Sequence, residues 1–355
     1  MLAEDFFSSI QSHYNNEQPF VVYCKPNSEE VVSLLQKDNE LYKITDFSEN
    51  GFIFSPFDIR KDTILIPFSR SQTTKLDYQL VEHDDIESQV LRSHSDKEKH
   101  IALITKAIDG IKNETYQKIV VSRIHTLTLK SFELITIVKR LLNFYNSAFT
   151  YCWYHPQVGL WLGATPERLL KTENETFSSM ALAGTKTFEG SLDVNWNQKE
   201  IKEQQFVTDY QINQLKEHLD NMEVSEPHTI RANNVLHLKT EISGKLKSKS
   251  IKQLIHVLHP TPAVCGLPKT DAMQFILDHE DYNREFYTGF LGEINFESEQ
   301  DDFRNSDLYA NLRCTQIKGN QALVYVGGGI TEESKVDLEW QETISKTKTI
   351  RELFG

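Results

Sequence analysis

The chain has 355 residues, of which 39% are hydrophobic and 25% charged, a composition typical of a globular protein with one large core or two modest ones. Its formal net charge of −13 argues against nucleic acid or an anionic membrane as a partner, since both bind clustered Lys and Arg. No apolar run approaches the roughly 20 residues of a membrane-spanning helix. The N-terminal stretch MLAEDFFSSIQSHY is acidic and amphipathic, unlike a signal peptide, so we expect a cytoplasmic protein. An anionic substrate would need positive charge supplied locally by its site.

The four cysteines, Cys24, Cys152, Cys265 and Cys314, lie far apart and form no C-x-x-C pair. This spacing does not match a zinc or redox motif. We therefore expect buried free thiols.

Residues 1–95 are interpreted as one region, which ends in the charged stretch HSDKEKH. A helix is predicted from about Ala3, and short apolar runs predict strands at residues 20–23 and 63–67. Residues 96–355 form the second region.

From residue 96 onward, helical and strand patterns alternate. The β-branched run at residues 118–129 predicts a long strand, and the absence of Pro and Gly from 197–219 predicts a long helix with one buried face. Leu308 to Ile317 is interpreted as one strand, paired with 322–326 through a Lys318-Gly319-Asn320 turn. The remaining predictions are helices at 100–111, 132–145 and 336–353, and strands at 149–154, 159–163 and 290–296.

Two acidic pairs have helical spacing: Glu200 with Glu203 on the central helix, and Glu339 with Glu342 on the last one. Residues three apart share a helical face, so two facing helices could present these carboxylates to Mg²⁺. The alternative is that both pairs are solvated helix faces.

Lys118 opens the long β-branched run in QKIVVSR. A lysine at a strand edge is usually solvated or prevents edge pairing. The functional alternative is a lysine desolvated enough to lose its proton and act as a general base.

Glu167 in WLGATPERLL follows an apolar strand, on a turn that carries Gly163 and Pro166. It could stabilise a helix start through the dipole, or it could be a general acid. The second role would require a pKa raised by burial or by a neighbouring carboxylate.

The triplet Gly327-Gly328-Gly329 follows an apolar strand, and we place it beside Arg313 on the partner strand and Lys346 on the last helix. Glycine amides and an arginine fork could hold an anion. The alternative is a plain turn at the end of the strand.

The order of these motifs resembles the chorismate-utilising family, which includes the isochorismate, salicylate, anthranilate and aminodeoxychorismate synthases. The match extends from about Lys118 to the C-terminus and is closest to isochorismate synthases of the menaquinone or siderophore type. The matching motifs are KIVVSR, GATPERLL, LAGT, KEIKEQQFV, HLKTEISGKL, LHPTPAVCGLPK, YNREFYTGFLGEI, LRC, GGGI and EWQETISK.

The resemblance implies an α+β fold of two packed β-sheets flanked by helices, with Mg²⁺ and chorismate in a deep cleft. Residues 1–95 would be a variable N-terminal part of the same fold, and 96–355 the chorismate-binding catalytic core. This N-terminal part lacks the tryptophan-binding signature of a feedback-inhibited anthranilate synthase.

The resemblance also implies roles for individual residues. Glu203 and Glu342 match the principal magnesium ligands, and Glu200 and Glu339 match their acidic supports. The remaining matches concern the substrate: Arg313, Gly328, Gly329 and Lys346 surround its side-chain carboxylate, while Gly184, Thr185 and His237 occupy cleft positions.

Within the family, lysine at the position of Lys118 is typical of enzymes that add water, whereas ammonia-using anthranilate synthases carry glutamine. Aminodeoxychorismate synthases often carry a nucleophilic lysine where this chain has Ala183. The implied reaction is an attack of water at ring carbon 2, with Lys118 as base and Glu167 as the acid that protonates the departing C4 hydroxyl.

Two departures from the family pattern stand out: Gln204-Gln205 after the metal glutamate, and Lys239-Thr240 after His237. The second favours isochorismate as the product over salicylate. A salicylate synthase, an anthranilate synthase and an inactive chorismate-binding relative stay as alternatives. No glutamine amidotransferase partner is expected, because water needs no ammonia channel; the family includes monomers, and a monomer is one alternative here.

Overall fold

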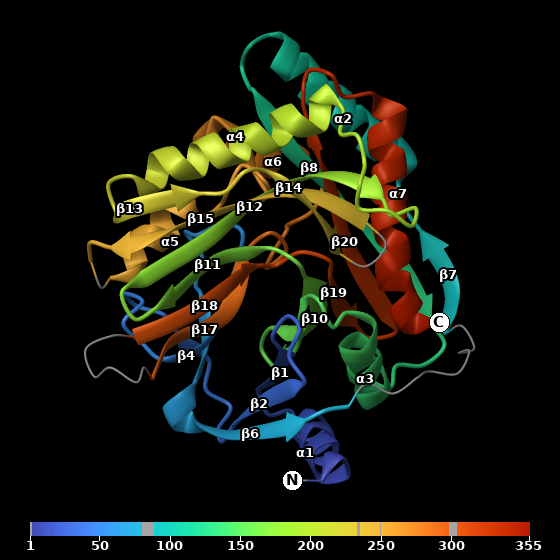
Figure 1. Cartoon of the computed structure of the whole chain (residues 1–355). Coiled ribbons are helices and arrows are strands. Elements are labelled where there is room, and N and C mark those ends of the chain that lie inside the picture. The colour runs from blue at the N-terminus through green and yellow to red at the C-terminus, as the bar shows by residue number, and fades with distance from the viewer. Residues whose placement is uncertain (1, 80–88, 233–234, 249, 298–303) are drawn as a thin grey trace.

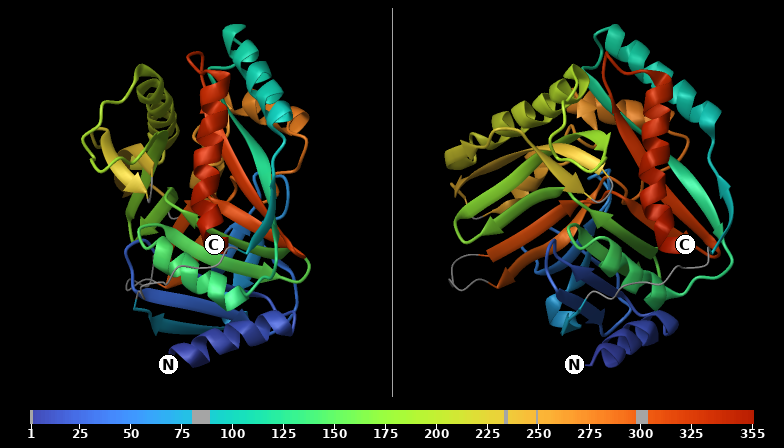
Figure 2. Two further views of the ribbon diagram at one scale, coloured as in Figure 1. Left: turned by 90° about the vertical axis from the view of Figure 1, so that its right-hand side faces the viewer. Right: turned by 45° about the vertical axis from the view of Figure 1, so that its right-hand side comes forward.

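The computed structural model describes residues 2–79, 89–232, 235–248, 250–297 and 304–355, apart from the side chain of Thr349. Its described strands form two sheets of ten, in which every pairing is antiparallel (Figure 1). Helices cover the outer faces of both sheets (Figure 2). This is the predicted α+β fold.

The first sheet contains β8, which begins at the candidate base Lys118, and β20, which carries the glycine triplet. Strand β7 (Val90–His94) pairs with one end of β8. The order of the others is β16 (Gly266–Leu267), β8 (Lys118–Leu129), β20 (Gln321–Ile330), β19 (Cys314–Lys318), β10 (Gly159–Thr165), β9 (Phe149–His155), β1 (Phe20–Cys24), β2 (Glu30–Gln36) and β6 (Ser71–Asp77).

The second sheet contains β12 and β15, which flank the pocket described below, and β14 (His228–Ala232) pairs with β15. The order of the others is β13 (Leu219–Val224), β15 (Val235–Leu246), β12 (Thr176–Thr187), β11 (Arg168–Glu173), β18 (Arg304–Ala310), β17 (Phe290–Glu297), β4 (Gly51–Ser55), β5 (Ile64–Pro67) and β3 (Tyr42–Lys43). Strands from the first 95 residues therefore extend both sheets.

The helices divide between the sheets. On the first sheet lie α1 (Ala3–Asn15), α2 (Lys97–Lys112), α3 (Leu134–Phe144), α6 (Lys269–His279) and α7 (Val336–Arg351). On the second lie α4 (Gln198–Leu215) and α5 (Ile251–Leu258). Two short 3₁₀ turns, at Phe68–Arg70 and Glu352–Phe354, complete the described elements.

Aromatic side chains fill the space between the two sheets. Strand residues alternate in direction, so Phe20 and Val22 of β1 pack under α1 and α3 while Val21 and Tyr23 point at the other sheet. Rings stack across the interface, as in the pair Phe149–Tyr309 at 4.3 Å between centroids. Both faces of the central strands are buried, which is why they appear in the sequence as continuous apolar runs.

Most predicted elements are present, and the long strand has the predicted bounds, Lys118–Leu129. The long helix ends at Leu215 rather than 219, because Leu219 begins β13. All four cysteines are buried and free, as predicted. In the described part of the chain, no helix has both the length and the apolar character required to cross a membrane.

The strand predicted from Leu308 to Ile317 is wrong. β18 ends at Ala310 in the second sheet and β19 begins at Cys314 in the first, so residues 311–313 carry the chain from one sheet to the other. Arg313 has a positive φ of 47°, which breaks the extended run. Arg313 accordingly precedes β19 instead of lying on the strand that pairs with β20.

The interpretation of Gly327-Gly328-Gly329 as a segment after the strand is also wrong. All three residues lie inside β20 and pair with Ser122, Val121 and Val120 of β8. A Cβ atom on Gly327 would lie 2.8 Å from the Val121 carbonyl oxygen. The triplet is a stretch of strand without side chains, not a turn.

Arg284 anchors the segment after α6 to β8. Its guanidinium is buried, forms an ion pair of 2.6 Å with Glu280, and donates to the Val120 and Val264 carbonyls. Removing one partner of a buried ion pair leaves an uncompensated charge. We expect Arg284→Met to lower the free energy of unfolding by about 3 to 5 kcal/mol in urea titrations.

The matched control is Lys75→Met, which removes the exposed 2.9 Å ion pair with Glu30. That change should cost at most about 0.5 kcal/mol. Equal losses in the two variants would contradict the anchoring role of Arg284.

Candidate active site

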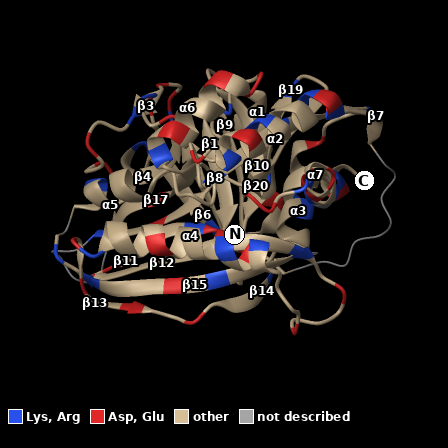
Figure 3. Cartoon of the chain, turned by 90° about the horizontal axis from the view of Figure 1, so that it is seen from above, with Lys and Arg blue, Asp and Glu red and all other residues tan. Residues whose placement is uncertain are grey.

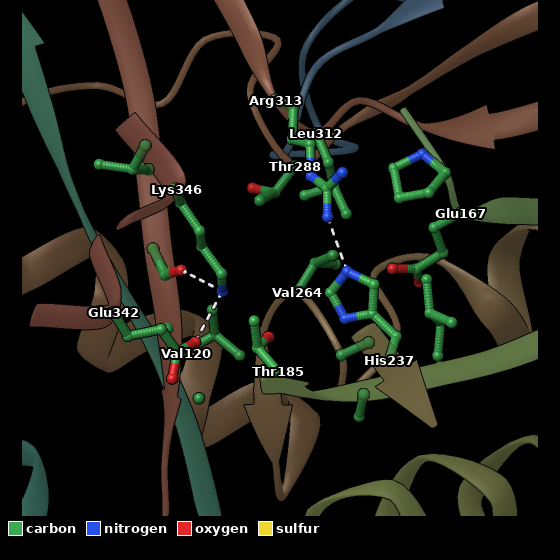
Figure 4. A pocket seen from close by; sticks show the side chains of 18 of the residues that line it. Val120, Glu167, Thr185, His237, Val264, Thr288, Leu312, Arg313, Glu342 and Lys346 are labelled. Carbon is green, nitrogen blue, oxygen red and sulfur yellow. Dashed lines mark hydrogen bonds and ion pairs between the residues drawn. The ribbon is translucent and has the colours of Figure 1, made fainter. Parts of the chain in front are cut away.

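A pocket lies between the two sheets, under α4 and α7, and most of the predicted site residues line it (Figure 4). Its inner part has a volume of about 100 Å³ and is lined by β12, β15 and β20 and by the residues before β11 and β19. An outer hollow of about 530 Å³ lies between the N-terminal end of α4 and α7. Thr185 and Glu342 line both, so the two spaces share a wall.

The glycines of β20 let the site assemble. A Cβ on Gly329 would collide with Glu203 Oε1 and lie 3.0 Å from Lys118 Cε. A Cβ on Gly328 would lie 3.5 Å from Glu342 Oε1. The missing side chains therefore leave room for carboxylates of α4 and α7 directly against the strand.

Three carboxylates gather there, each paired with a lysine. Glu203 lies 3.0 Å from Lys118, and Glu342 lies 2.7 Å from Lys346. Glu339 lies 2.5 Å from Lys199. Negative and positive side chains thus alternate around the β20 glycines, and basic and acidic residues are also interspersed along the outside of α4 (Figure 3).

Glu200 does not join this cluster. Its carboxylate accepts a hydrogen bond of 3.1 Å from the Asn197 backbone N–H and completes a capping box at the start of α4. The helical spacing alone could not show that the first glutamate of the pair caps the helix.

The pairing with lysine sets the charge on Glu203. Burial raises its pKa, but the ammonium groups of Lys118 and Lys199 outweigh burial, so the pKa lies below its ordinary value. Glu339 differs, because burial raises its pKa more than Lys199 lowers it. The two carboxyls therefore have opposite pKa shifts.

The donor chemistry fits a hard cation such as Mg²⁺. Glu203, Glu339 and Glu342 offer carboxylate oxygens from two helices, and within the described residues Glu339 Oε2 is buried without a hydrogen-bond partner. Among residues 2–79, 89–232, 235–248, 250–297 and 304–355, no group of three acidic, His or Cys side chains is already arranged to hold a metal ion. Each carboxylate is paired with a lysine instead.

Lys118 is fully buried and does not line the pocket itself. The Glu203 carboxylate lines the pocket and lies between the Lys118 ammonium and the open space. The solvated strand-edge interpretation of Lys118 is therefore wrong.

Glu167 occupies the two-residue connection between β10 and β11 and is 3% exposed. Its backbone carbonyl accepts a bond from the Ala310 N–H, and its side chain faces the pocket on the side of His237, opposite Lys346 and Glu342 (Figure 4). Burial raises the pKa of Glu167 to about 8, against the opposing field of Lys118. The carboxyl is thus mostly protonated at neutral pH, and no helix begins there for it to cap.

Arg313 and His237 form a pair inside the pocket. Arg313 Nη2 donates to His237 Nε2 at 2.6 Å, so the imidazole carries its proton on Nδ1 and donates it to the Gly184 carbonyl at 2.8 Å. Burial, with Arg313, lowers the pKa of His237 to about 3, so the ring is neutral. A bulge in β12 at Gly184, where φ is +72°, places this carbonyl and Thr185 at the pocket.

Several pocket residues were not anticipated from the sequence. Lys199 pairs with Glu339, while Tyr287, Thr288 and Tyr325 line the inner pocket. Lys199 directly precedes Glu200, so a basic residue next to the acidic motif was the available signal. Thr288 has a positive φ of 60°, which the sequence does not indicate.

Gln204 and Thr240, two of the residues that depart from the family pattern, contact each other. Gln204 Nε2 donates to Thr240 Oγ1 at 2.7 Å and to Thr208 Oγ1 at 2.8 Å, and all three residues are buried. None of the three lines the pocket. These departures form one hydrogen-bonded contact between α4 and β15, behind the site.

The chain belongs to the chorismate-binding enzyme family, since the model described as "Chorismate binding enzyme" matches residues 60–355. This confirms the family that the motifs indicated. Isochorismate synthase EntC of Escherichia coli K12 is 30% identical over 251 residues, which cover 67% of this chain and 62% of EntC. Isochorismate synthase MenF of Bacillus subtilis is 29% identical over 271 residues, 73% of this chain and 56% of MenF. The matched part is thus less than two thirds of either relative.

Solved structures agree on the fold. DhbC from Bacillus anthracis superposes with a TM-score of 0.80 at 22% identity, covering 98% of this chain and 99% of that one. Anthranilate synthase component I from Streptococcus pneumoniae gives a TM-score of 0.67 at 17% identity, covering 94% and 90%. Both likenesses confirm the two-sheet architecture.

The raised pKa of Glu167 should make stability depend on pH. The unfolded carboxyl ionises near its ordinary value of 4.5 and the folded one near 8, so the folded state holds the extra proton between those values. Stability contributed by this proton is lost as pH rises from about 4.5 to 8, by up to about 5 kcal/mol in this order-of-magnitude conversion. Glu167→Gln should therefore gain stability over the native protein as pH rises.

Urea unfolding of both proteins at pH 5, 6, 7 and 8 measures this difference. A difference in free energy of unfolding that stays constant with pH would show that Glu167 is ionised throughout the range.

Proposed function

We propose that this protein is an isochorismate synthase, which adds water at C2 of chorismate and expels the C4 hydroxyl. The observation that carries the proposal is the pairing of Glu167, protonated near neutral pH, with Lys118, close enough for their charges to interact at one pocket. An acid and a base in one site are what this exchange of hydroxyl groups requires. The relatives EntC and MenF are both named isochorismate synthases.

Glu167 is the general acid in this proposal. Loss of a ring hydroxyl needs a proton on the departing oxygen, and Glu167 holds one at neutral pH because of its burial. Its position across the pocket from Lys346 and Glu342 suits protonation from one face of a bound ring (Figure 4).

Lys118 is the general base. The chain carries lysine here rather than the glutamine of ammonia-using relatives, and the side chain is buried beside the pocket wall. Glu203 lies between Lys118 and the open space, so the base reaches water only after this carboxylate turns away from the ammonium.

Cations at the pocket suit the two carboxylates of chorismate. Arg313 lines the inner pocket and is oriented by His237. Lys346 lines the same pocket, and its ammonium donates to the Gly327 carbonyl at 3.0 Å. A guanidinium and an ammonium supply the local positive charge that an overall charge of −13 does not provide. Tyr287, Tyr325 and Thr288 also line the inner pocket.

Mg²⁺ would be held by Glu203, Glu342 and Glu339, and when bound it would supply a positive centre for a substrate carboxylate. The lysines on these carboxylates would then be released from their pairs. Glu200 would act only by fixing the start of α4.

The product assay tests the function directly. Incubation with chorismate and Mg²⁺ should yield isochorismate, and chelation of the metal with EDTA should abolish turnover until Mg²⁺ is restored. Separation by liquid chromatography identifies the product. Salicylate together with free pyruvate, formed without an added lyase, would indicate a salicylate synthase, and a requirement for ammonia would indicate an anthranilate synthase.

The base assignment has its own test. Lys118→Met keeps the volume of a fully buried side chain but cannot accept a proton, so kcat should fall by about 100-fold or more while chorismate still binds. Chorismate binding is measured by calorimetry and turnover by product formation. The control is Lys202→Met, which changes an exposed residue and loses ion pairs of 3.0 Å with Glu333 and 3.9 Å with Glu332; it should keep kcat within about twofold. A fully active Lys118→Met enzyme would remove Lys118 from the mechanism.

A further inference from the structure

A second cavity, of about 490 Å³, lies on the outer side of β8. It is bounded by α2, by β8 around residues 122–124 and by residues 279–282, at the end of α6 and just beyond it. Within the described residues, its lining has no member in common with the inner pocket or the outer hollow. The proposed reaction uses none of these residues.

Arg123 is the unusual residue of this cavity. The side chain is 5% exposed, its Nε–H donates to Thr343 Oγ1 at 2.9 Å, and its guanidinium lies 4.5 Å from the ring centroid of Trp340. Neither Nη1 nor Nη2 has a hydrogen-bond partner among the described residues. The great majority of buried N–H groups in proteins have a hydrogen-bond partner, and a buried guanidinium without an acceptor is unfavourable.

The carboxylates at the cavity are already occupied by other cations. Lys99 pairs with Asp281 at 2.9 Å and with Asp96 at 3.4 Å. Glu280 forms its 2.6 Å ion pair with Arg284. No described carboxylate is left for Arg123, so this guanidinium carries uncompensated positive charge.

Two buried imidazoles, His100 at the lining of the cavity and His125 two residues along β8, lie close enough to feel the charge of Arg123 but do not balance it. Burial, together with Arg123, lowers the pKa of both His100 and His125 to about 4, so both rings are neutral near pH 7. Their Nδ1 atoms also have no partner among the described residues. Burial lowers the pKa of Arg123 itself to about 10, which leaves it charged. Three polar side chains in one place thus have unused hydrogen-bonding groups.

We propose that this cavity binds a small oxyanion, a carboxylate or phosphate group, on the guanidinium of Arg123. The two free Nη groups can donate two parallel hydrogen bonds to the oxygens of such a group. Stacking on Trp340 and the bond to Thr343 hold the fork in one orientation, so little side-chain freedom is lost on binding. Lys106, exposed at the lining of the cavity, adds a second positive charge.

The site lies next to the helix that carries the active-site carboxylates. Trp340 follows Glu339 and Thr343 follows Glu342 on α7, so the two sites use different faces of one helix. Trp340 stacks on Arg123 and therefore should report binding through its fluorescence.

The test titrates the full chain with sodium phosphate and, separately, with sodium malonate, at ionic strength held constant with NaCl. Calorimetry and tryptophan fluorescence should both show saturable binding, and Trp340→Phe should lose the fluorescence change but keep the heat. Saturation that also changes the Trp340 fluorescence supports the site, and saturation by phosphate alone or by malonate alone identifies the preferred group. Heat without a fluorescence change would belong to the cations of the inner pocket and would overturn the proposal. No saturable binding of either anion up to about 20 mM, well above a millimolar Kd, would overturn the proposal.

Variants locate the site. Arg123→Met should weaken binding by at least about tenfold, since it removes the fork. The matched control Arg140→Met also removes a buried guanidinium, one that donates to the Leu353 carbonyl under α3, and should leave binding unchanged. Lys106→Glu changes an exposed residue, so it should fold normally and weaken binding by about threefold or more. If Arg123→Met fails to fold, the Lys106→Glu result decides: unchanged affinity there, or in a folded Arg123→Met, overturns the proposal.

Discussion

The ion pair between Lys118 and Glu203 is the contact on which the site depends, because it joins β8 of the first sheet to α4, which packs on the second. Both partners are buried, so each needs the other to compensate its charge. A further pair, Lys199–Glu339, joins α4 to α7. Ion pairs therefore hold α4 and α7 in place over the site, while stacked aromatic rings hold the two sheets together beneath it.

The environment of each carboxyl determines its charge. Glu167 is buried and, among the residues that the structure describes, forms no ion pair with an ammonium, so its pKa rises to about 8. Glu203 is also buried, yet contact with Lys118 outweighs burial and keeps it ionised. Two glutamates at one pocket thus have pKa shifts in opposite directions, which suits the general acid and the metal ligand that we propose. Their roles follow from their neighbours and not from residue type.

Much of the fold was predictable, because β8, α4 and α7 have continuous apolar or helical patterns that local sequence determines. The motifs also indicated Lys118, Glu167, Arg313 and His237, and the structure brings them to one pocket or its wall. Long-range geometry was not predictable. The sequence did not show that residues 311–313 pass from one sheet to the other. Two short strands joined by three residues have the same sequence pattern as one long strand. The helical spacing also did not show that Glu200 caps a helix while Glu203 lies at the inner pocket.

Residues 311–313 pass from one sheet to the other, so mutations between the sheets can change the position of Arg313. Asn311 is held from both sides, since its side chain accepts from the Tyr151 hydroxyl of the first sheet and donates to the Phe286 carbonyl near the second. Arg313 follows two residues later, so the angle between the layers sets the position of the guanidinium. Under the proposed function, a mutation deep in the aromatic interface would weaken substrate binding while the protein is still folded. The affinity for the substrate would then report how well the two sheets pack against each other.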